Sequence, residues 1–520
     1  MNRIKALTLI TLVSLISLPA AFAQGDATVK KIIEISKTDN RTMQHLDVLC
    51  NRIGGRLAGS DAYDNAVQWA AGEMRSWGMQ VRIEDAGTVP VGFNRGPWSG
   101  KLLGDNAMSL HFATPSYTSG TKGVQVGHVL IEPKSQEEFD RMKLMLKGAW
   151  VLIGGTNEGY PMSISAKADH RRDSIIAENN KIAAQNNEIQ RANWMGGEHK
   201  DLLPLIEEPA LFYRQMREAG ILGIIQSSKV PIQAMYDRKN MESMTFNNLP
   251  SVPDIKLDEH QYDIIKQMAE ERRIFMLEFD IRNHFKPGPI TYHNVIGIIP
   301  GTKYPDEYVI ISAHLDAYDV ATGGVDDGSG VAPTLEAARL IMQAGGKPKR
   351  TILVCLFAAE EYGLVGSKTW VDHNRDKLPM ISNMFNRDGG PMPPTGINVP
   401  EAMLDDMTQI CKPLNSINPD FPFTVTKSEP RQKPTVARGT DAGSFAVEGV
   451  PTISFNSDDV KGYNFDYREI WHTERDLYNM SIPEYQNHAA VVTAVAAYGV
   501  ANLNHLLSRK GLFKEETPAP

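Results

Sequence analysis

The sequence predicts an α/β fold with a mostly parallel central sheet flanked by helices. Continuous apolar runs occur at residues 308–313, 351–357 and 451–455. Such runs are typical of strands that are buried on both faces of a parallel sheet. Residues 331–343 have the spacing of a helix and separate the first two runs, so strands and helices alternate as this fold class requires.

The length indicates more than one domain, because 520 residues exceed what one ordinary core accommodates. We expect a leader at residues 1–23 and a catalytic domain in two parts, at residues 24–120 and 286–515. The character of the sequence changes near residue 121, where short strands and a short helix begin. These features predict a smaller α+β domain inserted at residues 121–285.

The first residues have the pattern of a secretory leader. Arg3 and Lys5 precede the mostly apolar residues 6–18, and small residues suit cleavage after Ala23. We therefore expect export to the periplasm or the medium. A retained membrane anchor is the alternative, and the short apolar run disfavours it.

The net charge narrows the classes of molecule that the protein is expected to bind. The net charge is −8, and neither long acidic runs nor a basic cluster accompanies it. This balance argues against a nucleic-acid surface and gives no polybasic patch for a membrane.

The opening of the catalytic domain reads as a loop followed by a helix and a strand. Residues 51–60 are rich in small residues, and residues 61–77 carry apolar residues at helical spacing. Gly78 is placed to end that helix, and residues 79–84 look like a strand.

The expected insert contains short strands and one polar excursion. Residues 124–131, 149–153 and 220–225 are strand-like, and a short helix at residues 214–219 precedes the last of them. Residues 169–200 are polar with loosely helical spacing, so we expect an exposed helical excursion there.

The end of the chain and the cysteines carry structural predictions. Residues 488–507 are apolar but interrupted by polar residues, which favours a buried helix over a membrane span.

Cys355 lies in an apolar run, where a buried thiol is expected. Cys50 and Cys411 could pair in an oxidising compartment, but the sequence alone cannot join them.

Polar side chains follow three of the predicted strands at the point where each strand ends. His314 and Asp316 follow the first apolar run, Glu360 and Glu361 follow the second, and Asp388 follows a strand at about residue 385. Ligands of an open parallel sheet gather at the carboxyl ends of its strands, so we expect these side chains to meet at one edge.

His314 and Asp316 have the spacing of a metal-bound imidazole and the carboxylate that holds it. Two residues apart on a strand, their side chains share a face. Alone, the pair more often forms a structural hydrogen bond than a metal site.

Two further acidic pairs add to this set. Asp326 and Asp327 lie in a glycine-rich loop just before a helix, where a helix cap is the alternative to a bridging carboxylate. Glu360 and Glu361 follow a buried strand directly, so a cation would offset their repulsion. A solvated acidic turn is the alternative for the second pair.

His472 supplies a second imidazole, from a polar loop late in the chain that alone would read as surface. Two His, two Asp and one Glu form a nitrogen and oxygen set that suits zinc, with cobalt or manganese as substitutes. A two-metal site with one shared carboxylate is the implied arrangement.

At this point the chain resembles the co-catalytic di-zinc exopeptidases, a family that includes leucyl aminopeptidases and glutamate carboxypeptidases, and within it most closely the carboxypeptidase Q branch. The resemblance covers nearly all of the mature chain. Its motifs are His314-Leu315-Asp316, Val325-Asp326-Asp327-Gly328, Ala359-Glu360-Glu361-Tyr362-Gly363, Arg387-Asp388-Gly389 and His472-Thr473-Glu474-Arg475-Asp476, with weaker matches at Gly55-Arg56-Leu57 and Gly439-Thr440-Asp441.

The resemblance implies the role of each residue. Asp326 would bridge two zinc ions, with His314 and Asp388 completing one site and Glu361 and His472 the other. The general base would be the glutamate at position 360. The peptide bond after the bridging acid would be cis, and the insert would be a protease-associated domain.

A short peptide is the substrate that the resemblance implies, and a homodimer is the assembly. Whether the amino or the carboxyl end is recognised stays open. Two other functions occur on similar scaffolds: acyl transfer by glutaminyl cyclases with one zinc, and binding by receptors that have lost the metal site. The complete ligand set disfavours both.

Overall fold

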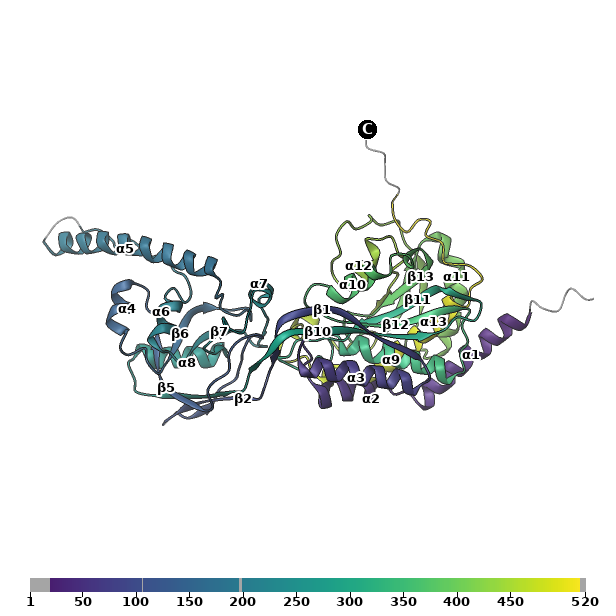
Figure 1. Ribbon diagram of the computed structural model, residues 1–520, viewed down its shortest axis with the longest axis horizontal. Coiled ribbons are helices and arrows are strands. Elements are labelled where there is room, and N and C mark those ends of the chain that lie inside the picture. The colour runs from purple at the N-terminus through teal and green to yellow at the C-terminus, as the bar shows by residue number, and fades with distance from the viewer. Residues whose placement is uncertain (1–18, 105, 196–198, 515–520) are drawn as a thin grey trace, which may run out of the picture.

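The chain folds into two lobes joined at a narrow waist (Figure 1). A computed structural model describes residues 19–104, 106–195 and 199–514, with the backbone alone for residues 19–26. Residues 1–18 of the expected leader lie outside this part of the chain, and the helix α1 begins at Pro19. Among the described residues, no helix is long and apolar enough to cross a membrane.

The first lobe is built on a five-stranded sheet in the order β1-β10-β12-β11-β13. Its strands are β1 (Gln80–Asn94), β10 (His284–Ile299), β11 (Tyr304–His314), β12 (Arg350–Phe357) and β13 (Ile381–Asn386). The strands β12, β11 and β13 run parallel, whereas β1 and β10 are antiparallel to their neighbours. The predicted α/β class with a mostly parallel sheet is confirmed, because β10 alone runs against the other four strands of this sheet. The long strands β1 and β10 also lead into the second lobe (Figure 1).

Helices cover both faces of this sheet (Figure 1). They are α1 (Pro19–Thr38), α2 (Thr42–Asp47), α3 (Asp61–Ser76), α9 (Gly328–Gln343), α10 (Val365–His373), α11 (Glu401–Cys411), α12 (Ala442–Ala446) and α13 (Pro483–Ala501). Alternate residues of β11 reach different cores: Val309 and Ile311 join the core with α3, α9 and α13, and Ile310 joins the core with α10 and α12. Burial on both faces explains the continuous apolar run of this strand.

Several local predictions are confirmed. The helix expected at residues 61–77 is α3, and the Ser60 side chain caps it by accepting a hydrogen bond from the Tyr63 amide. The apolar stretch expected at residues 488–507 lies mainly in the buried helix α13. By contrast, the strand expected at residues 79–84 continues to Asn94.

The apolar run at residues 451–455 does not form the predicted central strand. A small sheet of β14 (Pro394–Val399), β15 (Thr424–Lys427) and β16 (Phe455–Ser457) includes only its last residue. Pro451 cannot donate a ladder hydrogen bond, and the Asn383 side-chain amide bonds both the amide and the carbonyl of Ile453. Residues 451–453 are buried beside β13, where the Met384 amide donates to the Pro451 carbonyl at 2.9 Å, but the run forms no regular strand pairing with β13.

The second lobe holds an eight-stranded sheet in the order β3-β2-β9-β5-β6-β7-β8-β4. Its strands are β2 (Trp98–Leu103), β3 (Met108–Ser109), β4 (Phe112–Ala113), β5 (Gln125–Ile131), β6 (Ala149–Thr156), β7 (Gly223–Ser228), β8 (Asp254–Asp258) and β9 (Met276–Ile281). Its helices are α4 (Gln136–Met142), α5 (Ala166–Trp194), α6 (Tyr213–Ala219), α7 (Arg238–Glu242) and α8 (Glu259–Glu270). The sheet begins at Trp98, earlier than the expected boundary at residue 121. The reason is that β2, which precedes the expected boundary, pairs with β9 near the far end of the insert.

All three cysteines are free and buried. The possible pairing of Cys50 with Cys411 is therefore not formed. Cys50 lies under the glycine-rich loop, with its sulfur 4.0 Å from the Gly323 carbonyl oxygen, and Cys411 ends α11.

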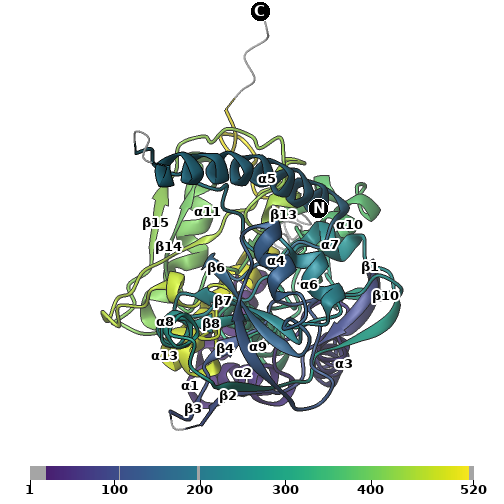
Figure 2. The same cartoon turned by 90° about the vertical axis from the view of Figure 1, so that its left-hand side faces the viewer.

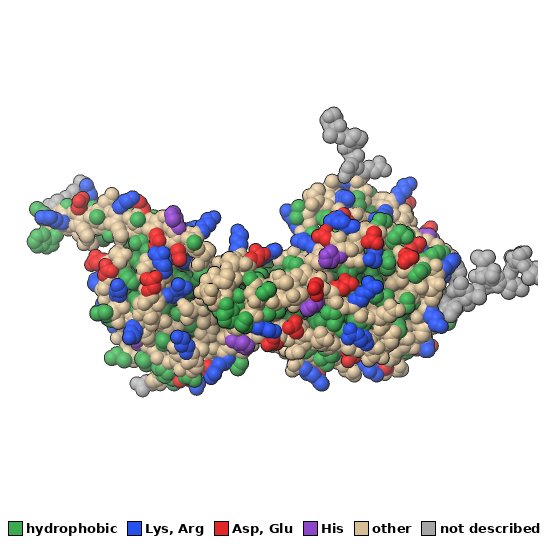
Figure 3. All heavy atoms as spheres, viewed as in Figure 1, with side chains coloured by type: hydrophobic (Ala, Val, Ile, Leu, Met, Phe, Trp, Pro, Cys, Tyr) green, Lys and Arg blue, Asp and Glu red, His purple; other side chains and the backbone are tan. Residues whose placement is uncertain are grey.

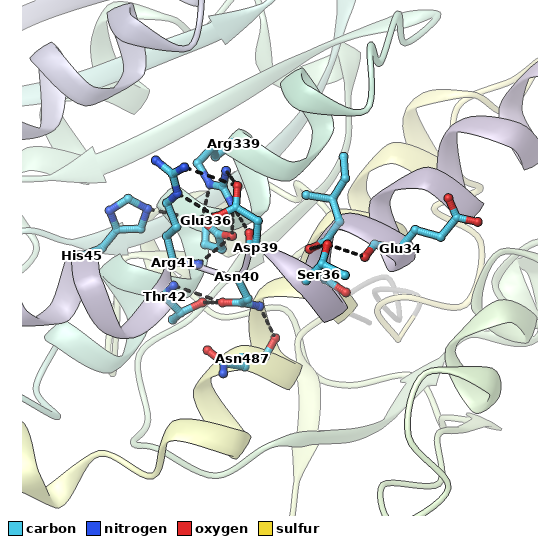
Figure 4. Close-up of polar contacts among 12 residues, drawn as sticks. Glu34, Ser36, Asp39, Asn40, Arg41, Thr42, His45, Glu336, Arg339 and Asn487 are labelled. Atoms are coloured by element: carbon cyan, nitrogen blue, oxygen red, sulfur yellow. Dashed lines mark hydrogen bonds and ion pairs between the residues drawn. The ribbon is translucent and has the colours of Figure 1, made fainter.

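A buried ionic network fixes residues 39–45, at the junction of α1 and α2, to α9 (Figure 4). Arg339 and Glu336 form an ion pair at 2.7 Å inside α9, with both side chains 0% exposed. Arg339 reaches Asp39 at 3.0 Å, and Glu336 accepts a hydrogen bond from the Arg41 amide at 3.0 Å and faces His45 at 3.3 Å. Because α9 begins directly after the glycine-rich loop, this network holds the helix that carries the loop.

The polar excursion is an arm formed by the 29-residue helix α5 and the segment that runs back beside it, residues 199–208 (Figures 1 and 2). Three asparagines spaced by seven residues each bond both the amide and the carbonyl of one residue of that segment. The pairs are Asn179 with Ile206, Asn186 with Leu203 and Asn193 with Lys200, at 2.7 to 3.0 Å.

The spacing of this asparagine ladder matches the two backbones. Seven residues of α-helix rise about 10.5 Å, and three residues of extended chain span about 10 Å. Through this ladder, a helix with little apolar surface can hold the extended segment 199–208 in place. Hydrophobic side chains gather at its outer end, where Trp194 is 89% and Met195 71% exposed (Figure 3).

Asn186→Ala tests the ladder. The substitution removes two hydrogen bonds to the Leu203 backbone, each worth about 0.5–1.5 kcal/mol, at a local cost of about 1–3 kcal/mol. We expect limited proteolysis to cleave residues 199–208 several-fold faster than in the wild type. The matched control is Asn187→Ala, at the exposed neighbouring position. Equal cleavage of the two variants would contradict a stabilising role for the ladder.

Candidate metal centre

The carboxyl edge of the central sheet gathers the predicted ligands. His314 is the last residue of β11, and Asp388 follows the end of β13 by two residues. Glu361 lies in the turn after β12, and Asp326 lies two residues before α9. His472 comes from the loop before α13. All five side chains thus converge on the edge that the sequence predicted.

One group of possible ligands contains His314, Asp326 and Asp388, whose ligand atoms all lie within 4.8 Å of one another. The His314 Nε2 atom is 3.2 Å from Asp326 Oδ1 and 3.9 Å from Asp388 Oδ1. His314 Nδ1 lies 3.0 Å from the Asp316 carbonyl oxygen, which can only accept a hydrogen bond. The proton therefore sits on Nδ1, and Nε2 keeps a free lone pair for a metal ion.

The second group contains Asp326, Glu361 and His472, again within 4.8 Å. The His472 Nε2 atom is 3.1 Å from Glu361 Oε2 and 3.5 Å from Asp326 Oδ2. The two oxygens of Asp326 thus face different imidazoles, as a bridging carboxylate requires. The Glu361 Oε1 atom is buried and has no protein hydrogen-bond partner among the described residues, so it is available to a cation.

These two groups fit two zinc ions by their chemistry: each offers imidazole nitrogen and carboxylate oxygen, and they share one acid. The peptide bond between Asp326 and Asp327 is cis, as the resemblance implied. The Asp327 carboxylate accepts a hydrogen bond from the His314 amide at 3.1 Å, which ties the loop to the end of β11.

Asp316 makes different contacts from those expected. Its carboxylate oxygens accept hydrogen bonds from the amides of Glu360 at 3.1 Å and Glu361 at 3.3 Å, and Oδ1 lies 3.6 Å from His314 Nδ1. The carboxylate therefore mainly fixes the turn that carries the two glutamates. The imidazole of His314 is held more closely by the Asp316 backbone.

Glu360 lies beside the ligand groups and is partly exposed. Burial raises its pKa to about 10, with the charge of Glu361 adding to the shift and His314 opposing it. Two bound dications would oppose protonation and bring this pKa down. A carboxyl group with such a tunable pKa suits proton transfer.

Burial and neighbouring charges also shift the pKa values of the ligands. Burial raises the pKa of Glu361 to about 7 and raises that of Asp388. Burial lowers the pKa of His472, but the charges of Glu361 and Asp326 outweigh this and raise it to about 9. The His472 ring also packs against Tyr318 in a tilted arrangement and is stacked on Trp471, with ring centroids at 4.1 and 4.0 Å.

Two buried side chains pin the loop that carries Asp326. The Arg56 guanidinium donates to the carbonyls of Leu315 at 2.6 Å, Thr322 at 2.9 Å and Gly323 at 3.1 Å. On the other side, the Asp476 carboxylate accepts a hydrogen bond from the Val325 amide at 2.6 Å and from the Asp326 amide at 3.3 Å. Both residues lie in motifs of the resemblance, but no local pattern in the sequence assigned them these contacts.

Comparison with known proteins supports the resemblance. Peptidase family M28 matches residues 294–496. The chain is similar to carboxypeptidase Q of Xenopus laevis, with 30% identity over 490 residues that cover 92% of this chain and 90% of the relative. Carboxypeptidase Q of Mus musculus is 24% identical over 496 residues, covering 94% of this chain and 92% of the relative.

The fold is also similar to solved structures. A peptidase M28 precursor from Shewanella amazonensis superposes with a TM-score of 0.56 and 21% identity, covering 94% of this chain and 99% of that chain. A zinc aminopeptidase from Bacillus subtilis superposes with a TM-score of 0.50 and 16% identity, covering 91% and 97%. These similarities support the α/β fold.

Asp476→Asn tests the pinning of the Asp326 loop. The amide group keeps the size of the side chain but offers one acceptor oxygen and places an NH₂ group against a backbone amide. We expect zinc affinity to fall about 10–100-fold, as measured by competition with a chelator. Asp466→Asn, at an exposed position of the same loop region, is the matched control and should bind zinc as the wild type does. Unchanged affinity in Asp476→Asn would show that the loop holds its shape without this carboxylate.

Proposed function

The chain belongs to peptidase family M28, and we propose that it is an exported exopeptidase that hydrolyses short peptides with two zinc ions. One observation carries the proposal: two groups of ligand atoms, each with one imidazole, share the carboxylate of Asp326. The relatives that cover most of the chain are carboxypeptidases by name, and a structural neighbour is a zinc aminopeptidase. The leader pattern at residues 1–23 supports export.

In this proposal five residues hold zinc. They are His314, Asp326, Glu361, Asp388 and His472. When bound, the two ions would polarise the substrate carbonyl and lower the pKa of a water molecule. The arrangement of Asp326, with one oxygen toward each imidazole, suits the bridging position.

Glu360 is the proposed general base. It takes a proton from the attacking water, whose oxygen forms a bond to the carbonyl carbon of the scissile peptide. As the carbon–nitrogen bond breaks, Glu360 gives that proton to the leaving amine. The two hydrogen bonds from the Glu360–Glu361 turn to Asp316 keep the base and the neighbouring ligand in fixed relation.

A complete set of ligands and a separate base distinguish this proposal from an inactive receptor and from a one-zinc cyclase. The substrate class follows the relatives' names, which refer to both ends of a peptide chain. Short peptides with either a free amino or a free carboxyl end are therefore the substrates to compare.

Glu360→Gln tests the mechanism. The amide cannot accept the proton, so we expect kcat to fall at least 100-fold while two zinc ions stay bound. Hydrolysis of a panel of dipeptides and aminoacyl anilides measures the loss, and elemental analysis counts the zinc. Glu401→Gln, on the exposed face of α11, is the matched control and should keep full activity.

The outcomes separate the parts of the proposal. Full activity in Glu360→Gln would assign the base to another residue. Activity of the wild type on anilides would indicate an aminopeptidase, and activity on free dipeptides alone would indicate a dipeptidase. A wild-type chain that binds zinc and hydrolyses neither class would contradict the proposed substrates.

A further inference from the structure

A short stretch of the second lobe, residues 232–236, contacts the loops that carry Glu361 and His472, and we call it the docking segment. Its Gln233 pairs with Thr473 in an antiparallel bridge, directly beside His472. The Ala234 amide donates to the His472 carbonyl at 3.4 Å, and the Gln233 side chain donates to the Trp471 carbonyl at 3.2 Å. The backbone that presents His472 is therefore paired with the second lobe.

Glu474 extends this contact. Its amide donates to the Ile232 carbonyl at 3.0 Å, and its carboxylate accepts a hydrogen bond from the Ile232 amide at 3.1 Å. The other carboxylate oxygen lies 2.7 Å from His111 Nε2, and His111 Nδ1 lies 3.0 Å from Asp258 at the end of β8. The loop of His472 is thus held from two places on the second lobe.

The last residue of the docking segment reaches another ligand. The hydroxyl of Tyr236 donates a hydrogen bond to the Glu361 carbonyl oxygen. Tyr236 is 6% exposed, and its ring packs against Tyr318 and Tyr362 with centroids at 5.6 and 5.0 Å. Tyr318 in turn lies against His472.

The metal centre has two halves, one with His314 and Asp388 and the other with Glu361 and His472, and the contacts of these two halves differ. In the part of the chain that the structure describes, the hydrogen bonds and ion pairs of His314 come from Asp316, Asp326, Asp327 and Asp388, all in the first lobe. Glu361 and His472 instead contact the docking segment. One half is therefore built within one lobe, and the other is built across two.

We propose that Tyr236 is a positioning residue that, with the docking segment, makes zinc binding at Glu361 and His472 depend on contact between the lobes. The His314–Asp388 half binds its ion without this contact. Zinc binding at the dependent half and docking of the second lobe are linked, so each favours the other. The inference rests on the proposed two-zinc function.

Removal of the Tyr236 hydroxyl acts locally, because other contacts hold the lobes together. Arg95 and Asp319 form a buried ion pair at 2.8 Å across the waist, and Ser116 donates to Asp319 at 2.6 Å. The Tyr117 and Tyr362 hydroxyls also lie 2.9 Å apart. Tyr236→Phe keeps the ring packing and all of these contacts.

The test is a zinc titration of the metal-free full chain against a chromogenic chelator, which gives the number of ions and the affinity of each. In Tyr236→Phe we expect the affinity for one ion to fall about 10–100-fold, as for other residues that hold a ligand in place, and the affinity for the second to stay unchanged. Tyr262→Phe is the matched control, because it removes a hydroxyl that donates to the Ile153 carbonyl at 2.6 Å inside the second lobe. It should bind both ions as the wild type does.

Variants with a single half identify the affected ion. His314→Ala leaves the Glu361–His472 half, and His472→Ala leaves the His314–Asp388 half. Adding Tyr236→Phe should weaken the remaining ion in the first background and leave it unchanged in the second. Equal weakening in both backgrounds would mean general destabilisation and would overturn the inference.

The remaining outcomes are also distinct. If the wild type binds two ions and Tyr236→Phe binds both as tightly, the positioning role is wrong and the two-zinc proposal stands. If the wild type binds one ion or none, the two-zinc proposal fails and this inference fails with it.

Discussion

Negative charge concentrated at the carboxyl edge of the central sheet is the constraint on which the rest of the site depends. Asp326, Asp327 and Asp441 are at most 6% exposed there, and the carboxylate of Glu361 is buried beside them. A carboxylate removed from water costs several kcal/mol unless a cation or donors offset the loss. Burial raises the pKa of both Glu361 and Asp441 to about 7, which indicates that the side chains alone do not fully offset it.

Such an edge can persist only if its loops cannot relax away from one another. Arg56 binds three carbonyls of the loops after β11, and Asp476 binds the amides of the same region from the opposite side. These two residues come from distant parts of the chain, so the complete fold fixes the loop that carries Asp326. Preorganisation of this kind reduces the cost of assembling a metal site.

Features of the fold and the site could be predicted where the sequence pattern that indicates them is local. The buried strands β11, β12 and β13 and the polar residues after them were predicted, because continuous apolar runs and strand ends are local features. The ligand set came from residue types in order, and the structure brings these residues together. The antiparallel pairing of β1 with β10 was missed, because strand pairing joins residues about 200 positions apart in the sequence and leaves no local mark.

Other misses have the same origin. The strand β2 has no clear alternation, so its place in the second sheet depends on β9, which forms almost at the end of the insert. The carboxylate of Asp316 lies 3.6 Å from the imidazole of His314, as predicted, but its hydrogen bonds to a turn 44 residues away were not predicted. Likewise, nothing near Tyr236 in the sequence indicates that its hydroxyl reaches Glu361.

The second lobe therefore contains two regions with different relations to the metal centre. The arm is ordered by its own asparagine ladder, whose partners are all within residues 179–206, so its shape does not depend on the sheet edge. The docking segment has the opposite character: its backbone pairs with the loop of His472, and its last side chain bonds Glu361. A change in the arm can leave the ligands in place, but a change in the docking segment moves the backbone of two of them. The lobe is thus part of the metal centre at one end and an independent surface at the other.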